Sequence, residues 1–180
     1  LAAHGVVDVG ESREQEATQK VAELSDLALN WHFIGQLQSK KAKRVREFSS
    51  WVHSLDRESL RVALAHDDGG EPTRVFIQIN LSGDAHRGGV APAELPSFAD
   101  LVVETPGLQL QGVMAVAPLG AEPRRAFAEL REMSDLLRRG HPDARFISAG
   151  MSHDFEEAIA EGATHLRIGS AITGNRPERR

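Results

Sequence analysis

The fold is indicated most directly by the stretch Phe146-Ile147-Ser148-Ala149-Gly150-Met151-Ser152-His153-Asp154. A short apolar run typical of a strand ends here in a turn of small residues, and a helix is expected to begin near Ser152. Gly150 permits a close backbone approach, and the free N–H groups of a helix start attract an anion. The alternative is a simple capping turn, in which the Ser152 hydroxyl caps its own helix.

A second stretch, Leu166-Arg167-Ile168-Gly169-Ser170-Ala171-Ile172, repeats this arrangement of strand, glycine, hydroxyl and helical turn. Eight-stranded α/β barrels often bind a phosphate between the loops that follow strands seven and eight. Two such turns in succession near the end of the chain therefore predict a phosphate-binding cup between Ser148 and Gly174.

The rest of the chain alternates short strand-like runs with stretches of helical periodicity, which indicates βαβ units and a parallel sheet. Seven runs are expected to be strands: Val6–Val9, His32–Gly35, Trp51–Leu55, Arg74–Leu81, Leu110–Val116, Arg145–Ser148 and His165–Ile168. Helical stretches lie between them, among them Arg13–Leu29, Pro92–Glu104, Glu122–Arg139 and Phe155–Glu161.

Seven strands are one short of a barrel, and the chain opens on residues typical of the end of a helix, Leu1-Ala2-Ala3-His4-Gly5. We therefore expect a (β/α)8 TIM-type barrel whose first strand and most of whose first helix precede Leu1, with residues 1–180 forming one domain. The rival interpretation is a complete seven-stranded, doubly wound sheet.

Composition narrows the class of protein. The 180 residues carry a formal net charge of −5 and include no cysteine, which excludes disulfides and thiol chemistry and fits a cytoplasmic setting. No apolar run approaches the roughly 20 residues that span a bilayer. The acidic charge balance argues against nucleic-acid or membrane partners. The basic cluster from Lys40 to Arg46 is interpreted as a solvated helix face, and the alternatives are an anion-attracting rim or a weak nucleic-acid contact. The eight histidines show no metal-binding spacing.

Arg167 is expected to point into the barrel, because strand alternation separates it from Leu166 and Ile168. A buried arginine needs a partner. That partner is either an interior carboxylate such as Glu11, in a salt bridge, or the ring or phosphate of a ligand.

Three other segments carry weaker signals. His32 lies in a strand and is either a hydrogen-bonded core residue or part of a site, and Met114 lies in a run that also suits plain barrel lining. The segment Asn80–Gly89 is a loop whose His86, Arg87 and glycines either approach an anion or form an ordinary surface turn.

At these residues the sequence resembles the pyridoxal phosphate homeostasis proteins, a family similar to the N-terminal domain of alanine racemase. The resemblance covers nearly the whole chain in family order, from Gly10 to Gly174. Its motifs are Gly10-Glu11-Ser12 with Gln15-Glu16, Trp31-His32-Phe33-Ile34-Gly35 with Leu37-Gln38-Ser39, Gly112-Val113-Met114-Ala115, Ser148-Ala149-Gly150-Met151-Ser152 and Arg167-Ile168-Gly169-Ser170.

This resemblance implies a single barrel that binds pyridoxal 5′-phosphate, abbreviated PLP. Five residues would hold its phosphate, namely Ser148, Gly150, Met151, Gly169 and Ser170. Arg167 would lie near the pyridine nitrogen, and His32 and Met114 would line the ring pocket. An arginine there disfavours protonation of the ring nitrogen, which suits carrying the cofactor better than stabilising a carbanion.

The chain departs from the family pattern at several positions. Ser12 and Lys40 stand where the family has asparagine, and Arg87 where it commonly has lysine. The family attaches the cofactor covalently to a lysine on its first strand, and none of the four lysines here, Lys20, Lys40, Lys41 and Lys43, is expected to end a strand facing inward.

The favoured interpretation is thus a monomeric PLP-binding homeostasis protein with no reaction of its own, whose partners are PLP and PLP-dependent apo-enzymes. One alternative is a racemase or decarboxylase of related fold. The chain has no tyrosine to act as the opposing base of a racemase, and no room for that enzyme's second domain. The other alternative is a phosphosugar-binding barrel enzyme.

Overall fold

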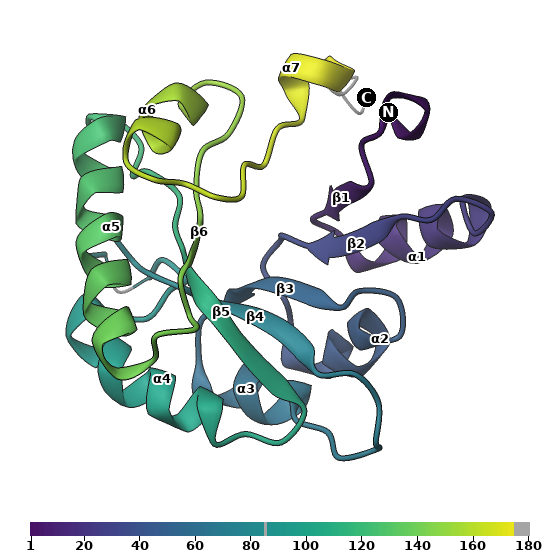
Figure 1. The fold of residues 1–180 in the computed structure, drawn as a ribbon, viewed down its shortest axis with the longest axis horizontal. Coiled ribbons are helices and arrows are strands. Elements are labelled where there is room, and N and C mark those ends of the chain that lie inside the picture. Colours follow the sequence, from purple (N-terminus) through teal and green to yellow (C-terminus); the bar gives the residue numbers. More distant parts are fainter. Residues whose placement is uncertain (85, 175–180) are drawn as a thin grey trace.

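The computed structural model describes residues 1–84 and 86–174, and it shows a curled parallel sheet whose outer face is covered by helices (Figure 1). The sheet has six strands in the order β1-β2-β3-β4-β5-β6, and every neighbouring pair is parallel. The strands are β1 Asp8–Glu11, β2 Asn30–Phe33, β3 Trp51–Leu55, β4 Thr73–Gln78, β5 Leu108–Met114 and β6 Phe146–Ser148. The predicted parallel α/β class is confirmed.

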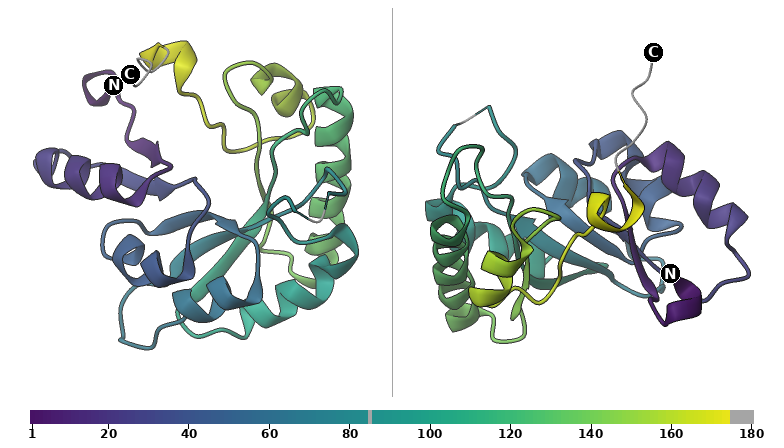
Figure 2. Two further views of the ribbon diagram at one scale, coloured as in Figure 1. Left: turned by 180° about the vertical axis from the view of Figure 1, so that it is seen from behind. Right: turned by 90° about the horizontal axis from the view of Figure 1, so that it is seen from above.

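Helices α1 to α6 surround the outside of the curl, and α7 lies at its opening, as the left-hand view of Figure 2 shows. The α-helices are α1 Glu14–Glu23, α2 Ala42–Arg46, α3 Glu58–Leu64, α4 Leu95–Val103, α5 Pro123–Gly140, α6 Phe155–Ala160 and α7 Ser170–Thr173. Three short 3-10 helices are η1 Ala2–His4, η2 Ser39–Lys41 and η3 Pro92–Glu94.

One predicted strand is wrong. Residues 165–168 run alongside β6 but form only an isolated bridge, from Ser148 to His165. Three backbone hydrogen bonds join this segment to β6 and the residues that follow it, from the His165 N–H to the Ile147 carbonyl, from the Ala149 N–H to the His165 carbonyl and from the Arg167 N–H to the Gly150 carbonyl. These bonds give only one isolated bridge, so the segment is extended without being a strand.

The hydrophobic core lies between the outer face of the sheet and the helices. Val52, Val75, Val113 and Ile147, from four successive strands, are all buried there. Because successive strand residues point to opposite faces, the residues between them face the hollow of the curl. This alternation separates an apolar outer layer from a polar and aromatic interior.

The basic cluster forms η2 and α2, and its charges are largely paired. Glu14 of α1 is buried, and its carboxylate lies 3.0 Å from Arg44 Nη1 and 3.2 Å from Lys41 Nζ. Arg46 pairs with Asp68 at 3.7 Å. The ion pairs of this cluster with Glu14 therefore join α1 to η2 and α2.

Strand β5 approaches β6 closely at Gly112, whose φ is 152°. A Cβ atom at this position would lie 1.8 Å from the carbonyl oxygen of Phe146. We predict that Gly112→Ala lowers the free energy of unfolding by about 3 kcal/mol, because it combines a steric clash with a strained backbone. Urea denaturation followed by circular dichroism measures the change.

Gly140→Ala is the matched control, since a Cβ atom at Gly140 has no neighbour within 4 Å. Gly140 is the last residue of α5, so its replacement should leave stability unchanged or raise it by up to about 1 kcal/mol. Equal effects of the two substitutions would refute the close approach at Gly112.

Candidate functional site

The interior of the curl is lined by rings and polar groups from the strands. Trp51 stacks on the His32 ring with centroids 5.0 Å apart, and Phe76 lies 4.5 Å from the His53 ring. The His165 ring closes this cluster at 5.1 Å from Phe76. The group shields the interior polar atoms from water on the side of β2, β3 and β4.

Arg167 points into this interior, as strand alternation predicts. Its Nη1 donates to the Ser148 hydroxyl at 2.7 Å, and its Nη2 donates to the Ala115 carbonyl at 2.9 Å. The alternative partner, Glu11, accepts instead from Lys20 of α1, so a salt bridge between Glu11 and Arg167 is not formed. The guanidinium is therefore held by two neutral oxygens, and no carboxylate of the described residues contacts it.

Ser148, at the end of β6, has its hydroxyl committed inside the molecule. The side chain is fully buried, and its Oγ lies 2.8 Å from His53 Nδ1 as well as 2.7 Å from Arg167 Nη1. This placement differs from the expected contact with a phosphate, because the hydroxyl faces the interior ring cluster and not the turn that follows.

The two glycine turns do come together, and Ser152 joins them. Its Oγ accepts from the Gly169 N–H at 3.4 Å and from the Ala171 N–H at 3.2 Å. The alternative in which Ser152 caps its own helix is wrong, because α6 begins at Phe155 and its N-cap is Asp154. The Ser152 hydroxyl thus links the turn after β6 to the start of α7.

Gly150 is required by packing in this first turn. Its φ is 87°, and an added Cβ would lie 2.7 Å from the Ala158 Cβ and 3.0 Å from the Phe155 Cα. Gly169 has open space instead, with no atom within 4 Å of an ideal Cβ. The first glycine therefore lets α6 pack against the turn, while the second leaves room above it.

The other predicted cup residues stand around this space. Met151 is partly exposed, and its N–H donates to the Asp154 carboxylate at 2.6 Å. Ser170 is exposed and begins α7. Within the described residues, the N–H groups of Ser152 and Ser170 have no acceptor, so they are free to bind an anion.

His32 and Met114 both lie on the interior face. Met114 is buried and pairs in register with Ser148, next to Val113 of the outer core. His32 is buried in β2, with Nδ1 at 2.9 Å from His53 Nε2 and Nε2 at 3.2 Å from Asp8 Oδ1. Both residues are therefore near the Ser148 end of the interior, although the His32 ring is engaged with other side chains.

Burial sets the charge states inside. It lowers the pKa of His53 well below the ordinary histidine value, and the positive charges of His32, Arg167 and His165 act in the same direction. Burial also lowers the pKa of His32, against the opposing effect of Asp8. Burial lowers the pKa of Arg167 to about 10, so the guanidinium stays charged at neutral pH.

Sequence reasoning missed three members of this site: Asp8, His53 and His165. A signal for His53 was present in Trp51-Val52-His53-Ser54-Leu55, because strand alternation places His53 on the same face as Trp51. No local signal pairs Asp8 with His32, because the 24-residue separation is bridged only by strand register.

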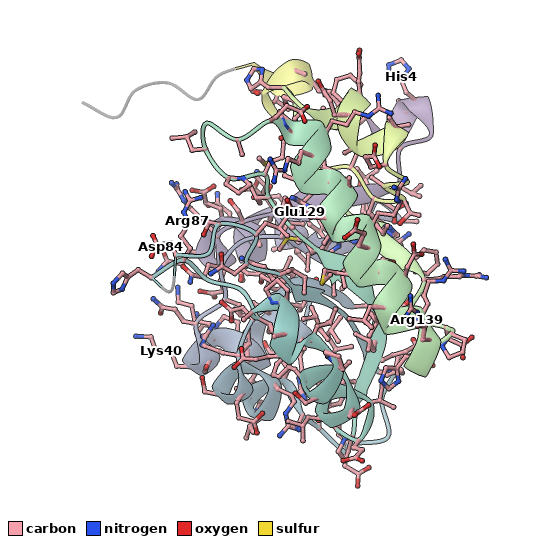
Figure 3. All side chains as sticks on the ribbon, turned by 90° about the vertical axis from the view of Figure 1, so that its left-hand side faces the viewer. His4, Lys40, Asp84, Arg87, Glu129 and Arg139 are labelled. Atoms are coloured by element: carbon pink, nitrogen blue, oxygen red, sulfur yellow. The ribbon has the colours of Figure 1, made fainter. Side chains whose placement is uncertain are left out.

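The rim of the site lies at the carboxyl ends of the strands. Lys40 follows β2, whereas Asp84 and Arg87 follow β4. Figure 3 shows these three residues on the opposite side of the molecule from Arg139 of α5. Lys40, Arg87 and Lys43 are exposed. Asn80 stabilises the loop that follows β4, because its Nδ2 donates to the carbonyls of Asp84 and Arg87.

Two negative findings apply to the part of the chain that the structure describes. No group of three or more histidine, aspartate or glutamate side chains is arranged to hold a metal ion. No described helix combines the length and apolar character needed to cross a membrane.

The buried histidines predict a stability that falls on acidification. Burial lowers the pKa of His32, His53 and His165 in the folded chain, so the unfolded chain binds more protons. The free energy of unfolding is therefore expected to decrease as the pH falls below about 6.5, the ordinary histidine pKa. Urea titrations at a series of pH values measure it.

His165→Phe should make this decrease smaller, since it removes one of the groups that resist protonation in the folded state. His4→Gln is the control, because His4 is exposed in η1, and it should keep the full pH dependence. Stability that stays constant on acidification would contradict the interior placement of these rings.

Comparison with known protein sequences identifies the family of this chain. The family model described as alanine racemase, N-terminal domain, matches residues 1–177. The pyridoxal phosphate homeostasis protein of Pseudomonas aeruginosa is 45% identical over 179 residues, which is 97% of this chain and 76% of that protein. The protein of the same name from Corynebacterium glutamicum is 41% identical over 182 residues, covering 96% of this chain and 81% of that one.

Comparison with solved structures gives the same family. PipY of Synechococcus elongatus, in its form with PLP bound, superposes with a TM-score of 0.83 at 37% identity, covering 92% of this chain and 80% of that one. Alanine racemase from Corynebacterium glutamicum shares the fold, with a TM-score of 0.72 at 21% identity over 94% of this chain and 48% of the enzyme. The chain therefore belongs to the alanine racemase N-terminal domain family and, within it, to the pyridoxal phosphate homeostasis proteins.

Proposed function

We propose that this chain binds PLP reversibly and serves its intracellular homeostasis, without catalysing a reaction of its own. The observation that carries the proposal is Arg167, a partly buried guanidinium that points into the interior beside two glycine turns that Ser152 joins. The PLP-bound form of PipY supports it, as do the names of the curated relatives.

The donor set fits the phosphate of PLP. A phosphate ester carries negative charge at neutral pH and accepts hydrogen bonds from backbone N–H groups. The free N–H groups of Ser152 and Ser170, the Ser170 hydroxyl and the open space at Gly169 supply these contacts. Gly150 and Met151 complete the wall, with the Met151 N–H shared with Asp154.

Arg167 is proposed to keep the pyridine nitrogen of bound PLP unprotonated. Bound PLP supplies an aldehyde and an electron-withdrawing pyridine ring. A guanidinium beside the pyridine nitrogen opposes its protonation by like-charge repulsion, which weakens the ring as an electron sink. His32 and Met114 are proposed to line the ring pocket, and Ser148 to support Arg167 from below as well as bordering the cup.

The lysines of this chain favour reversible binding. Lys20 is paired with Glu11 and Lys41 with Glu14. Lys40 and Lys43 are exposed on η2 and α2. None of the four extends into the interior described above, so the cup and Arg167 would provide the anchorage.

The open sheet is proposed to be most of an eight-stranded barrel. The six strands and the extended segment 165–168 form a parallel arc of seven positions, and the chain spans about three quarters of the length of the Pseudomonas relative. A single outer core runs along the arc, which supports one domain over residues 1–180. The same proposal includes a cytoplasmic monomer that delivers PLP to apo-enzymes.

Two enzyme functions are the alternatives. A racemase of this family needs an opposing base, and the tyrosine expected in that role is absent from the chain. A phosphosugar enzyme would use the cup alone and would leave Arg167, paired only with neutral oxygens, without a ring to contact. Arg167 therefore favours PLP over a sugar phosphate.

We predict that Gly169→Asp abolishes binding of both PLP and inorganic phosphate. A Cβ atom at Gly169 meets no atom within 4 Å, and the carboxylate added beyond it repels the phosphate. Visible absorbance titration measures PLP binding, and isothermal titration calorimetry measures phosphate binding. The bound PLP should also leave the wild-type chain on dialysis.

Gly140→Asp is the matched control, because it adds the same charge at a glycine that is equally unobstructed and lies at the end of α5. It should bind PLP as the wild type does. A chain that binds ribose 5-phosphate but not PLP would overturn the proposal in favour of a phosphosugar enzyme, and racemised alanine after incubation with PLP would favour the racemase.

A further inference from the structure

A continuous chain of four hydrogen bonds crosses the interior and joins five side chains. Asp8 Oδ1 lies 3.2 Å from His32 Nε2, and His32 Nδ1 lies 2.9 Å from His53 Nε2. His53 Nδ1 lies 2.8 Å from Ser148 Oγ, which accepts from Arg167 Nη1 at 2.7 Å. The chain begins at an exposed carboxylate on β1 and ends at the guanidinium beside the proposed ring site.

The two ends determine the direction of every bond. A guanidinium only donates, and an ionised carboxylate only accepts. The pKa of Asp8 is lowered, chiefly by a hydrogen bond from the Asn30 side chain at 3.0 Å, so this carboxyl is ionised at neutral pH. All four bonds must therefore run from Arg167 towards Asp8.

This direction assigns both imidazole tautomers. The Ser148 hydroxyl accepts from Arg167 and donates to His53 Nδ1, which must be unprotonated. His53 then carries its hydrogen on Nε2 and donates to His32 Nδ1, and His32 in turn donates from Nε2 to Asp8. Any other neutral tautomer leaves a buried donor or acceptor unpaired, which is unfavourable by about 1–3 kcal/mol.

The surroundings of His53 oppose a proton on Nδ1. The titratable groups that face it are His32 on β2, and His165 and Arg167 on the extended segment, all of which are cationic when protonated. Its remaining described ring neighbour is Phe76 on β4. A second hydrogen on His53 would also force the Ser148 hydroxyl to find a new acceptor in a fully buried place.

We propose that His53 is a positioning residue, which acts through Ser148 to hold the Arg167 guanidinium in the orientation that meets the pyridine nitrogen. Asp8, at the far end, sets the direction of the chain. For its effect on the cofactor this inference rests on the proposed function, whereas the tautomers it assigns are a property of the ligand-free protein.

The first test needs neither a ligand nor a substitution. Nuclear magnetic resonance of the chain with 15N-labelled histidine reports the protonation of each ring nitrogen. We expect His32 and His53 to be neutral Nε2–H tautomers at pH 7, and His53 to stay neutral when the pH is lowered to about 6.5, the ordinary histidine pKa. An Nδ1–H tautomer at His53, or half-protonation of its ring at about that pH, overturns the proposal.

The second test separates the ring from the phosphate. His53→Phe keeps a ring but loses the bond to Ser148, and we expect its dissociation constant for PLP to rise about tenfold, in line with the loss of a hydrogen bond that supports a charged group. The dissociation constant for inorganic phosphate, which contacts only the cup, is the internal reference and should not follow it.

His53→Asn is the matched variant, because the asparagine Oδ1 takes the place of Nδ1 and can accept from Ser148. It should recover most of the PLP affinity lost in His53→Phe, and His4→Phe should bind PLP as the wild type does. A folded His53→Phe chain that binds PLP at wild-type strength overturns the inference. Wild-type protein that binds no PLP overturns the proposed function instead, and the tautomer measurement then decides the inference alone.

Discussion

Alternation along parallel strands is the constraint on which the rest of this structure depends. Each strand sends one set of side chains outward to the helices and the other set into the hollow of the curl. The outer set, including Val52 and Val113, is apolar and fully buried. Because the outer layer forms the hydrophobic core, the inner side chains can be polar. His53, Ser148 and Arg167 are among these inner side chains and form hydrogen bonds there.

Glycine explains why several of the motifs are spaced as they are. A Cβ at Gly35 would lie 2.0 Å from the Ser12 carbonyl oxygen, so two motifs far apart in the sequence pack backbone against backbone. Gly150 lets α6 approach its own turn in the same way. Ser152 then joins that turn to the next one, because its hydroxyl accepts from the N–H groups of Gly169 and Ala171.

The interior polar groups are stable because each is satisfied by another. Among the residues that the structure describes, no carboxylate contacts Arg167, and its guanidinium is held by the Ser148 hydroxyl and the Ala115 carbonyl. Asp154 acts on this charge through space and favours the charged form. A charged guanidinium would oppose protonation of a neighbouring ring nitrogen.

The sequence by itself determined the parallel α/β class, the place of the two glycine turns and the inward direction of Arg167, because periodicity and turn chemistry are local. It also predicted a strand at residues 165–168, where pairing with a single neighbour leaves only a bridge. Only the tertiary structure decided that His53 and Ser148, 95 residues apart, share a hydrogen bond. Strand register, and not any local pattern, brings such side chains within hydrogen-bond distance of one another. The Ser148 hydroxyl therefore contacts both His53 and Arg167.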